Sequence, residues 1–498
     1  MANKKRVEVE FLFCTFGSIS KVPPSIVSVF KKQIIKGSAS NLAGILLGVV
    51  NNLWIFPLAF SLEQLGVYRW VERTGVLIAT IALLGLHRLY VRFQSTYSGE
   101  RAAQFLSNIV FGVLGMALLV GGTLSIFGAD LASRLDVDYS AGPLNTLGAV
   151  VAGTMLYALG LSIASSSKRI SLPFFLKNVG IRMALVLSTL AFLSHWLGFE
   201  GWMRLFALTH LAVGSIVLLY AVRLKKIALV RPRSLDDGSR KTYLAFSSSG
   251  IAMAIMTMSL TTIDSQMIAS VIGVEALGIY SIAFFIGSFV DGIRRPVSQA
   301  LSPQFANLWN EGNKTALGKI YARTSRLLMA VALLAFMVIV PNLDLLFSLI
   351  PDPERFQAAK PVVVLILASR IIDYSFGSNG EMLSNGPYYQ WNLGVLTVLV
   401  VGIVALNFWL LPIFGIAGAG WTLVIAYTVF NVAKAYLLWW KERLQPFSWV
   451  HLAMLLFAAV GTLGALQLSG ASLAQHILRN VVIGGTVGAA FFTLRKRL

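Results

Sequence analysis

The 498-residue chain is 56% hydrophobic and only 12% charged, with a mean hydropathy of +0.75. Soluble domains carry about twice that charged fraction, roughly 25%. The 41 Lys and Arg residues outnumber the 21 Asp and Glu residues, and the formal net charge is +20. Basic chains often bind nucleic acid, but here the cations separate apolar runs of about 20 residues, the length of a bilayer span. The composition therefore excludes soluble enzymes and nucleic-acid-binding proteins, and it predicts an all-α protein embedded in the lipid bilayer.

Cysteine and histidine usage excludes several kinds of site. Cys14 is the only cysteine, and the five histidines are scattered, so no disulfide framework and no metal site is expected. Phosphate-binding glycine loops, dinucleotide fingerprints and nucleophile elbows are absent from contexts that would support them. We expect no bound cofactor and no enzymatic activity.

The predicted elements form five regions in chain order. Residues 1–36 are a basic leader without a signal-peptide core, and the sequence leaves open whether residues 1–30 reflect a misassigned start. A six-span lobe (37–222), a basic linker (223–241), a second six-span lobe (242–440) and a last pair of spans with a basic tail (441–498) follow. The fourteen predicted spans cover residues 38–58, 68–89, 105–127, 144–164, 174–193, 202–222, 243–265, 277–293, 327–346, 361–376, 393–411, 417–439, 450–468 and 476–493.

The distribution of Lys and Arg among the short loops predicts the orientation. The leader, the linker 223–241, the stretch 314–326 and the tail are all rich in Lys and Arg. They fall on one side of the membrane if the number of spans is even. The opposite loops hold few cations and several carboxylates, such as Asp130 and Glu354. We therefore expect both termini in the cytoplasm.

A short motif recurs at an offset of 212 residues. Residues 63–68 read Glu-Gln-Leu-Gly-Val-Tyr, and residues 275–280 read Glu-Ala-Leu-Gly-Ile-Tyr. A weaker repeat links the Gly- and Trp-containing stretches at 198–202 and 415–421. Two copies of a six-span bundle in the same orientation imply a pseudo-two-fold axis along the membrane normal, which is typical of transporters with a site between the halves.

Several stretches carry a family resemblance that covers roughly residues 37–498. They are Ile263-Asp264 followed by Gly273, Leu277 to Ala283, Leu65-Gly-Val-Tyr68, Gly85 to Arg92, and Phe414 to Ala419. With these motifs the chain resembles the bacterial O-antigen and polysaccharide flippases. Their superfamily also contains the multidrug and toxin extrusion (MATE) transporters and the lipid II flippase. The resemblance implies two six-helix lobes in a V-shaped, MATE-like arrangement. It also implies a location in the bacterial inner membrane and transfer of an undecaprenyl-pyrophosphate-linked oligosaccharide from the cytoplasmic to the periplasmic leaflet.

Arginines within the predicted spans are candidate substrate ligands. A charge inside the bilayer should face a cavity or a partner, because its cost at the centre is at least about 2.5 kcal/mol. Arg69 and Arg73 lie four residues apart on one helical face, and each planar guanidinium group can bind phosphate oxygens through two parallel hydrogen bonds. Arg182 is a third candidate. For Arg69 and Arg73 the alternative role is anchoring at the membrane interface, with Glu72 neutralising one of them. For Arg182 the alternative is snorkelling to the membrane surface.

Asp264 is the sharpest acidic candidate, deep in the seventh predicted span. As a cavity carboxylate it would take up H+ or Na+, or orient a sugar, and this would couple transport to an ion gradient. As a structural acceptor it would bind nearby hydroxyls or a cation on another helix. The 212-residue offset pairs Asp264 with Asn52, which favours a shared polar cavity wall.

The remaining charged candidates are secondary. Arg370 and Asp373 lie three residues apart in the tenth predicted span, and we expect them to neutralise each other. Asp291 and Arg294 form a similar pair at the end of the eighth. The Gly44-x-x-x-Gly48 motif predicts close helix packing.

Three rival functions stay open in the sequence. An ion-coupled drug exporter of the same fold should have a more acidic and aromatic cavity. A lipid II flippase would share the whole design. A membrane polymerase or glycosyltransferase needs a large periplasmic loop, and the acidic loops here are short. The expected partners are the lipid-linked glycan, the bilayer and other polysaccharide assembly proteins, and no nucleic acid.

Overall fold

The computed structural model describes residues 40, 43–137, 139–167, 169–225, 229–233, 243, 247, 256, 262–467 and 473–494. All regular secondary structure in these ranges is helical. The predicted leader 1–36, the basic tail and most of the seventh predicted span lie outside them. Of the predicted linker 223–241, the structure describes residues 223–225 and 229–233.

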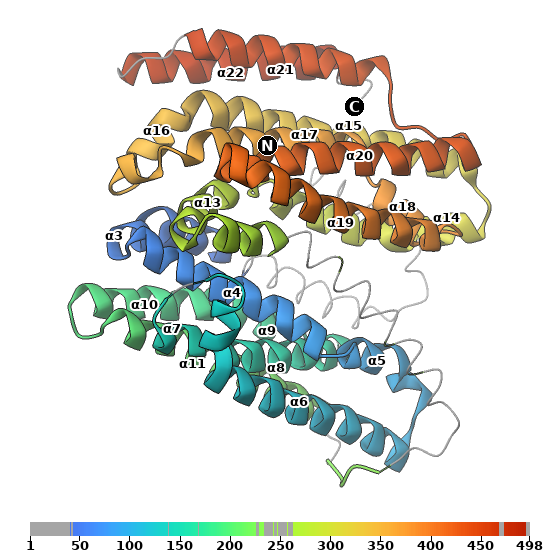
Figure 1. The fold of residues 1–498 in the computed structure, drawn as a ribbon. Coiled ribbons are helices and arrows are strands. Elements are labelled where there is room, and N and C mark those ends of the chain that lie inside the picture. Colours follow the sequence, from blue (N-terminus) through green and yellow to red (C-terminus); the bar gives the residue numbers. More distant parts are fainter. Residues whose placement is uncertain are drawn as a thin grey trace, which may run out of the picture.

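The N-terminal lobe is a bundle of antiparallel helices (Figure 1). Its elements are η1 (Asn51–Ile55), α3 (Phe56–Ala59), α4 (Leu62–Ala82), α5 (Leu86–Phe93), α6 (Gly99–Ser133), α7 (Ala141–Asn145), α8 (Leu147–Ser166), α9 (Ser171–Phe175), η3 (Leu176–Gly180), α10 (Ile181–Leu193) and α11 (Phe199–Lys225). Helix α8 lies at the centre, against α4, α6 and α11. Its glycines allow this close approach, since a Cβ at Gly153 would lie 2.4 Å from the His210 carbonyl oxygen.

The second span is broken between α4 and α5. The two segments differ in direction by 51°. Leu84 and Gly85 have φ values of +46° and +71°, a left-handed conformation that interrupts the helical hydrogen bonds. A side chain at Gly85 would also approach the Ser247 carbonyl oxygen at 3.2 Å. The break directs α5 away from the line of α4.

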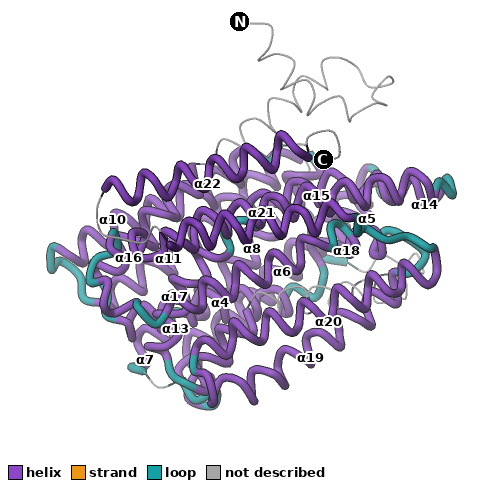
Figure 2. Tube along the Cα trace, turned by 90° about the horizontal axis from the view of Figure 1, so that it is seen from above, coloured by secondary structure: helices purple, strands orange, loops and turns teal. Residues whose placement is uncertain are grey.

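The C-terminal lobe repeats the helical bundle, and two further helices pack outside it. Its elements are α13 (Val274–Gly287), α14 (Asp291–Asn310), α15 (Lys314–Ile339), α16 (Leu343–Ser348), α17 (Ala359–Ser375), α18 (Asn379–Ser384), α19 (Tyr389–Phe414) and α20 (Ile416–Glu442), followed by α21 (Trp449–Gln467) and α22 (Leu473–Leu494). Helices α21 and α22 pack against each other and against α15, at the edge of the molecule. Figure 2 shows the long helices running in one common direction, with α5 and α14 at one end and α10 and α16 at the other.

The two copies of the repeated motif meet at the joint between the lobes. Helices α4 and α13 pack together. A Cβ at Gly66 would lie 1.8 Å from the Val274 carbonyl oxygen, and a Cβ at Gly278 would lie 2.3 Å from the Leu62 carbonyl oxygen. Both glycines and both carbonyls are related by the 212-residue offset. The predicted pair of pseudo-symmetric lobes is therefore confirmed, and the glycine repeated in the motif has a physical reason: only glycine lets the two backbones touch.

The length and composition of the helices make the protein a multi-pass membrane protein. Eight helices of the described part are long and apolar enough to cross a bilayer, or nine if the bent pair α4–α5 is one span. Two shorter apolar helices, Ala43–Ala59 and Val274–Gly287, fall below that length. The exact number of fourteen spans stays a prediction.

Candidate functional site: buried charges on both sides of the lobe joint

Arg69 is held on α4 by two neighbours. The helix begins at a capping box in which the Ser61 hydroxyl accepts from the Gln64 N–H, so its start is fixed about two turns before the arginine. Arg69 Nη1 lies 2.8 Å from Glu72 Oε2, and Nη2 donates to the Asn52 side-chain oxygen. Asn52, which the sequence repeat singled out, is thus a ligand of Arg69. The expected neutralisation by Glu72 is confirmed for this arginine.

Arg73 reaches from α4 to the opposite lobe. Its guanidinium lies over the Phe284 ring of α13, 4.4 Å from the ring centroid. One residue further, the Thr74 hydroxyl donates to Gln266 Oε1 at 3.0 Å. Arg69 and Arg73 therefore share a helical face, as predicted, but they have different surroundings. Arg73 stands at the joint between the lobes.

Arg182 of α10 lies against a helix face made of glycines. A Cβ at Gly48 would lie 3.1 Å from Arg182 Cζ, and a Cβ at Gly44 would lie 3.0 Å from Nη1. Asn51 Nδ2 donates to the Arg182 carbonyl oxygen at 3.2 Å. The predicted close helix packing is found at Gly44, where a Cβ would lie 2.8 Å from the Asn178 carbonyl oxygen, whereas at Gly48 the space is filled by a guanidinium and not by a backbone.

The three arginines form one cationic cluster. Glu72 attracts all three guanidinium groups, while Arg69 repels both Arg73 and Arg182. The Arg69 side chain is 12% exposed and the Glu72 side chain 34% exposed, so this part of the cluster is accessible to water. Three cations and one carboxylate leave an excess of positive charge in the N-terminal lobe.

Two π-helical turns flank this cluster. They are η1 (Asn51–Ile55), which supplies both asparagines, and η3 (Leu176–Gly180), which directly precedes Arg182 in α10. A π-turn inserts one residue into a helix and changes the direction of the side chains around it, and such turns are frequent at functional sites. Neither turn could be read from the hydropathy pattern, since both continue an apolar helix.

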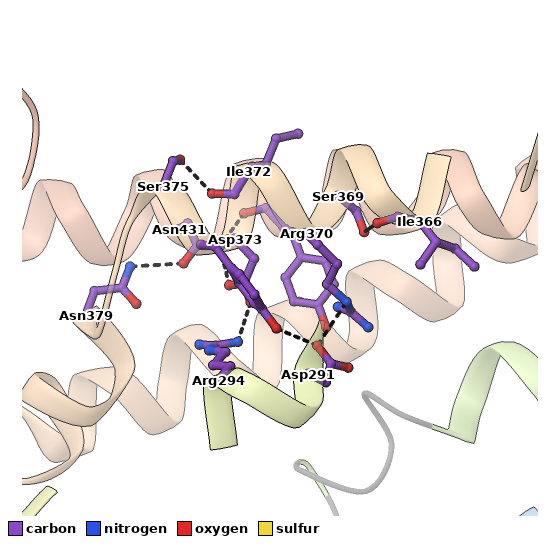
Figure 3. Close-up of polar contacts among 12 residues, drawn as sticks. Asp291, Arg294, Ile366, Ser369, Arg370, Ile372, Asp373, Ser375, Asn379 and Asn431 are labelled. Atoms are coloured by element: carbon purple, nitrogen blue, oxygen red, sulfur yellow. Dashed lines mark hydrogen bonds and ion pairs between the residues drawn. The ribbon is translucent and has the colours of Figure 1, made fainter. Parts of the chain in front are cut away.

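The charged residues of the C-terminal lobe pair across helices and not along them (Figure 3). Arg370 Nε of α17 lies 3.3 Å from Asp291 Oδ1 of α14, and Arg294 of α14 donates to Asp373 of α17. The predicted neutralisation of Arg370 by Asp373 is therefore wrong in its partners, and so is that of Asp291 by Arg294. The pairs exchange because side chains of α14 and α17 reach each other, so each cation meets its carboxylate on the other helix.

Polar residues that the sequence analysis did not single out complete this network. Tyr374 donates to Asp291 at 2.7 Å, Asn431 donates to Asp373 at 2.9 Å, and Asn379 donates to Asn431 at 2.9 Å. Lys434 of α20 is only 2% exposed, and its ammonium lies 3.7 Å from the Phe430 ring centroid. It interacts electrostatically with Asp373 and Glu381. The sequence feature that could have identified such residues is a polar side chain inside an apolar span, and both Asn431 and Lys434 have it.

Asp264 is buried, at 3% exposure, beside the lobe joint. Asn407 of α19 donates to its Oδ1 at 3.0 Å, and Tyr280 of α13 donates to its Oδ2 at 3.4 Å. Arg73 attracts this carboxylate from the other lobe. Asp264 and Asn52 thus both contact the second helix of their own lobe: Asn52 accepts from Arg69, and Asp264 accepts from Tyr280. Among the described residues, no cluster of three or more His, Cys, Asp or Glu side chains is suited to a metal ion.

Two helical lobes joined at a pseudo-two-fold glycine contact, with buried charges on both sides, form a MATE-like fold. The profile of the MatE family matches residues 250–380. No curated protein matches the sequence. The fold part of the resemblance noted in the sequence is confirmed by solved structures.

One solved structure, the lipid II flippase MurJ in an inward closed conformation, superposes with a TM-score of 0.74. The sequences are 12% identical, and the match covers 92% of this chain and 99% of MurJ. An inward-facing multidrug resistance MATE transporter of the MOP superfamily gives a TM-score of 0.57 at 16% identity, covering 82% of this chain and 98% of the other. A MATE structure in a bent conformation gives 0.54 at 16% identity, covering 88% and 100%.

Proposed function

We propose that the chain is a flippase that moves an undecaprenyl-pyrophosphate-linked oligosaccharide from the cytoplasmic to the periplasmic leaflet by alternating access of its two lobes. The observation that carries the proposal is the cationic cluster of Arg69, Arg73 and Arg182 around Glu72. A pyrophosphate carries several anionic oxygens, and guanidinium groups bind such oxygens in pairs. The polyprenyl tail needs no polar path, because it stays in the lipid.

The state of the lobe joint supports the same mechanism. The lobes touch through α4 and α13 at the glycine contact, and also through Trp54, which donates to the Leu349 carbonyl, and Arg355, which donates to the Phe60 carbonyl. Helices α3 and α16, which are next to Trp54, Phe60 and Leu349 in the chain, lie at the end of the molecule opposite α5 and α14 (Figure 1). By the distribution of Lys and Arg that end is the periplasmic one. In this proposal the described state is closed to the periplasm.

The test of the proposal is transport by an Arg69→Ala/Arg73→Ala variant. Each charge-assisted contact contributes about 1.5–3 kcal/mol, so losing two should slow transfer by about 100-fold or more. The readout is complementation of a flippase-null strain, together with transfer of a fluorescent oligosaccharide on undecaprenyl pyrophosphate in proteoliposomes. Arg204→Ala is the control, because Arg204 is an exposed arginine of the same lobe that pairs with Glu200. Normal transfer by the double variant would exclude these arginines from the substrate site.

A drug exporter of the same fold is the alternative with a distinct expectation. A cationic drug would be repelled by an excess of positive charge, so removing Arg69 and Arg73 should leave its export unchanged or increase it. Measuring efflux of a cationic dye with the same double variant separates the two functions. If the unmodified chain exported the dye but did not transfer the glycolipid, the drug-exporter function would be favoured.

Ion coupling through Asp264 is the second part of the proposal. Its support is a buried carboxylate with two neutral donors, Asn407 and Tyr280, at the lobe joint. Asp264→Asn keeps the size and most hydrogen bonds but removes the charge. We expect transfer by this variant to lose its dependence on an imposed H+ or Na+ gradient. Full transfer with an unchanged ion dependence would contradict the coupling role and leave Asp264 as a structural acceptor.

A further inference from the structure

Helix α5 carries a pair of arginines that the proposed function does not use. Arg88 and Arg92 lie one turn apart and are both exposed, whereas Leu89 and Tyr90 on the other side of the helix are buried. Helix α5 packs against α8. Because α5 follows the 51° break after α4, it is a short amphipathic segment that runs in a different direction from α4.

These arginines line an open depression of about 550 Å3. Val91 and Ser95 contribute from the same segment and Ser162 from α8. Among the described residues, no carboxylate lies within ion-pair distance of either guanidinium. Two guanidinium groups and two hydroxyls around one hollow are hydrogen-bond donors with unused capacity. Their combined chemistry suits a phosphate group.

The position of the depression indicates the source of that phosphate. Lys225, at the end of α11, donates to Gln94 at 2.9 Å on the neighbouring part of the segment. The basic linker predicted to be cytoplasmic begins in this region of the chain. Anionic phospholipids of the cytoplasmic leaflet attract basic residues near the membrane surface by about 1 kcal/mol each, and basic pockets beside membrane helices bind their headgroups.

We propose that the depression lined by Arg88, Arg92, Ser95 and Ser162 is a binding site for the phosphodiester headgroup of an anionic phospholipid. The two guanidinium groups hold the phosphate, and the apolar face of α5 keeps the helix on α8. A bound headgroup then fixes α5 relative to α8 at the point where the second span is broken. This site is separate from the cationic cluster around Glu72, so the proposal does not depend on which substrate is transported.

The experiment is native mass spectrometry of the full chain released from micelles that contain equal amounts of phosphatidylglycerol and phosphatidylcholine. We expect selective retention of phosphatidylglycerol, and we expect Arg88→Gln/Arg92→Gln to lower that retention by about tenfold. Arg101→Gln/Arg323→Gln is the matched control, because both are exposed arginines that do not line the depression. Equal losses in the two double variants would show a general surface-charge effect and overturn the proposal.

A second variant distinguishes a built site from charge alone. Ser162→Phe fills the depression without changing any charge, and it should also reduce phosphatidylglycerol retention. Retention that is unchanged in Ser162→Phe would overturn the role of the depression. Inorganic phosphate provides the remaining arm: displacement of the lipid only at a large excess supports a headgroup site. Displacement at stoichiometric phosphate would overturn the lipid as the ligand and identify a site for free phosphate.

Discussion

In the N-terminal lobe three arginines share Glu72, whereas in the C-terminal lobe Arg294 and Arg370 each have a carboxylate of their own. The lobes are built on the same repeat, and their glycine contact is reciprocal. The charges are not repeated: the 212-residue offset places Ser281 opposite Arg69 and Phe285 opposite Arg73. A shared architecture therefore holds two different electrostatic regions. An unbalanced cluster is suited to an anionic ligand, and a balanced one to holding helices together.

The largest effect we expect from this comparison is on stability, in the C-terminal lobe. Asp373→Asn removes the charge that faces Arg294 and leaves a buried cation without its partner. Breaking a buried pair costs about 3–5 kcal/mol, and the low end applies because the Arg294 side chain is 25% exposed. Thermal unfolding of the purified protein should report the loss. The double change Arg294→Met/Asp373→Leu removes both charges and should cost less than Asp373→Asn; a larger cost would contradict a structural pair.

A pair of matched variants should separate the two regions by their readouts. Arg182→Gln takes one of three cations from a cluster that has an excess of them, so glycolipid transfer should fall by about tenfold with little change in stability. Arg370→Gln leaves Asp291 without its cation, so stability should fall more than transfer does per folded molecule. Both variants are assayed in the same proteoliposomes at equal amounts of folded protein. If Arg182→Gln mainly destabilised the protein, the cluster would be structural and the contrast between the lobes would disappear.

The smallest effect concerns the glycine face that receives Arg182. Gly48→Ala places a methyl group about 3.1 Å from the guanidinium carbon, so the flexible arginine must shift by a few tenths of an ångström. Transfer should fall about two- to threefold while stability is kept, because Ala favours a helix by up to about 1 kcal/mol. Gly394→Ala is the control, since no atom lies within 4 Å of a Cβ there. Equal transfer by both variants would exclude a positioning role for Gly48.

The candidate residues differ in how far local sequence could predict them. Arg69 and Glu72 are close in the chain and on one helix, so their contact followed from helical spacing. Asn52 was found through the repeat, which carries three-dimensional information in the sequence itself. Asn407 and Lys434 were visible only as polar residues in apolar spans, without a partner that spacing could name. The partners of Arg370 and Asp373 were predicted wrongly. Their true partners, Asp291 and Arg294, lie on α14, about 80 residues away in the chain.

The sequence by itself determined that the protein is helical and embedded in a membrane, that its two halves are related, and that its interior charge is mostly cationic. Apolar runs, spacing along a helix and internal repeats are local properties, and hydrocarbon allows few alternatives to helices. Only the tertiary structure decided which charges meet. Helix packing brings α14 to α17 and α10 to the glycine face of the first span, and the low dielectric between packed helices makes those contacts strong. It is also the tertiary structure that brings Arg69 into contact with Glu72 and Asn52 and places Arg73 and Arg182 near enough to interact with the same carboxylate.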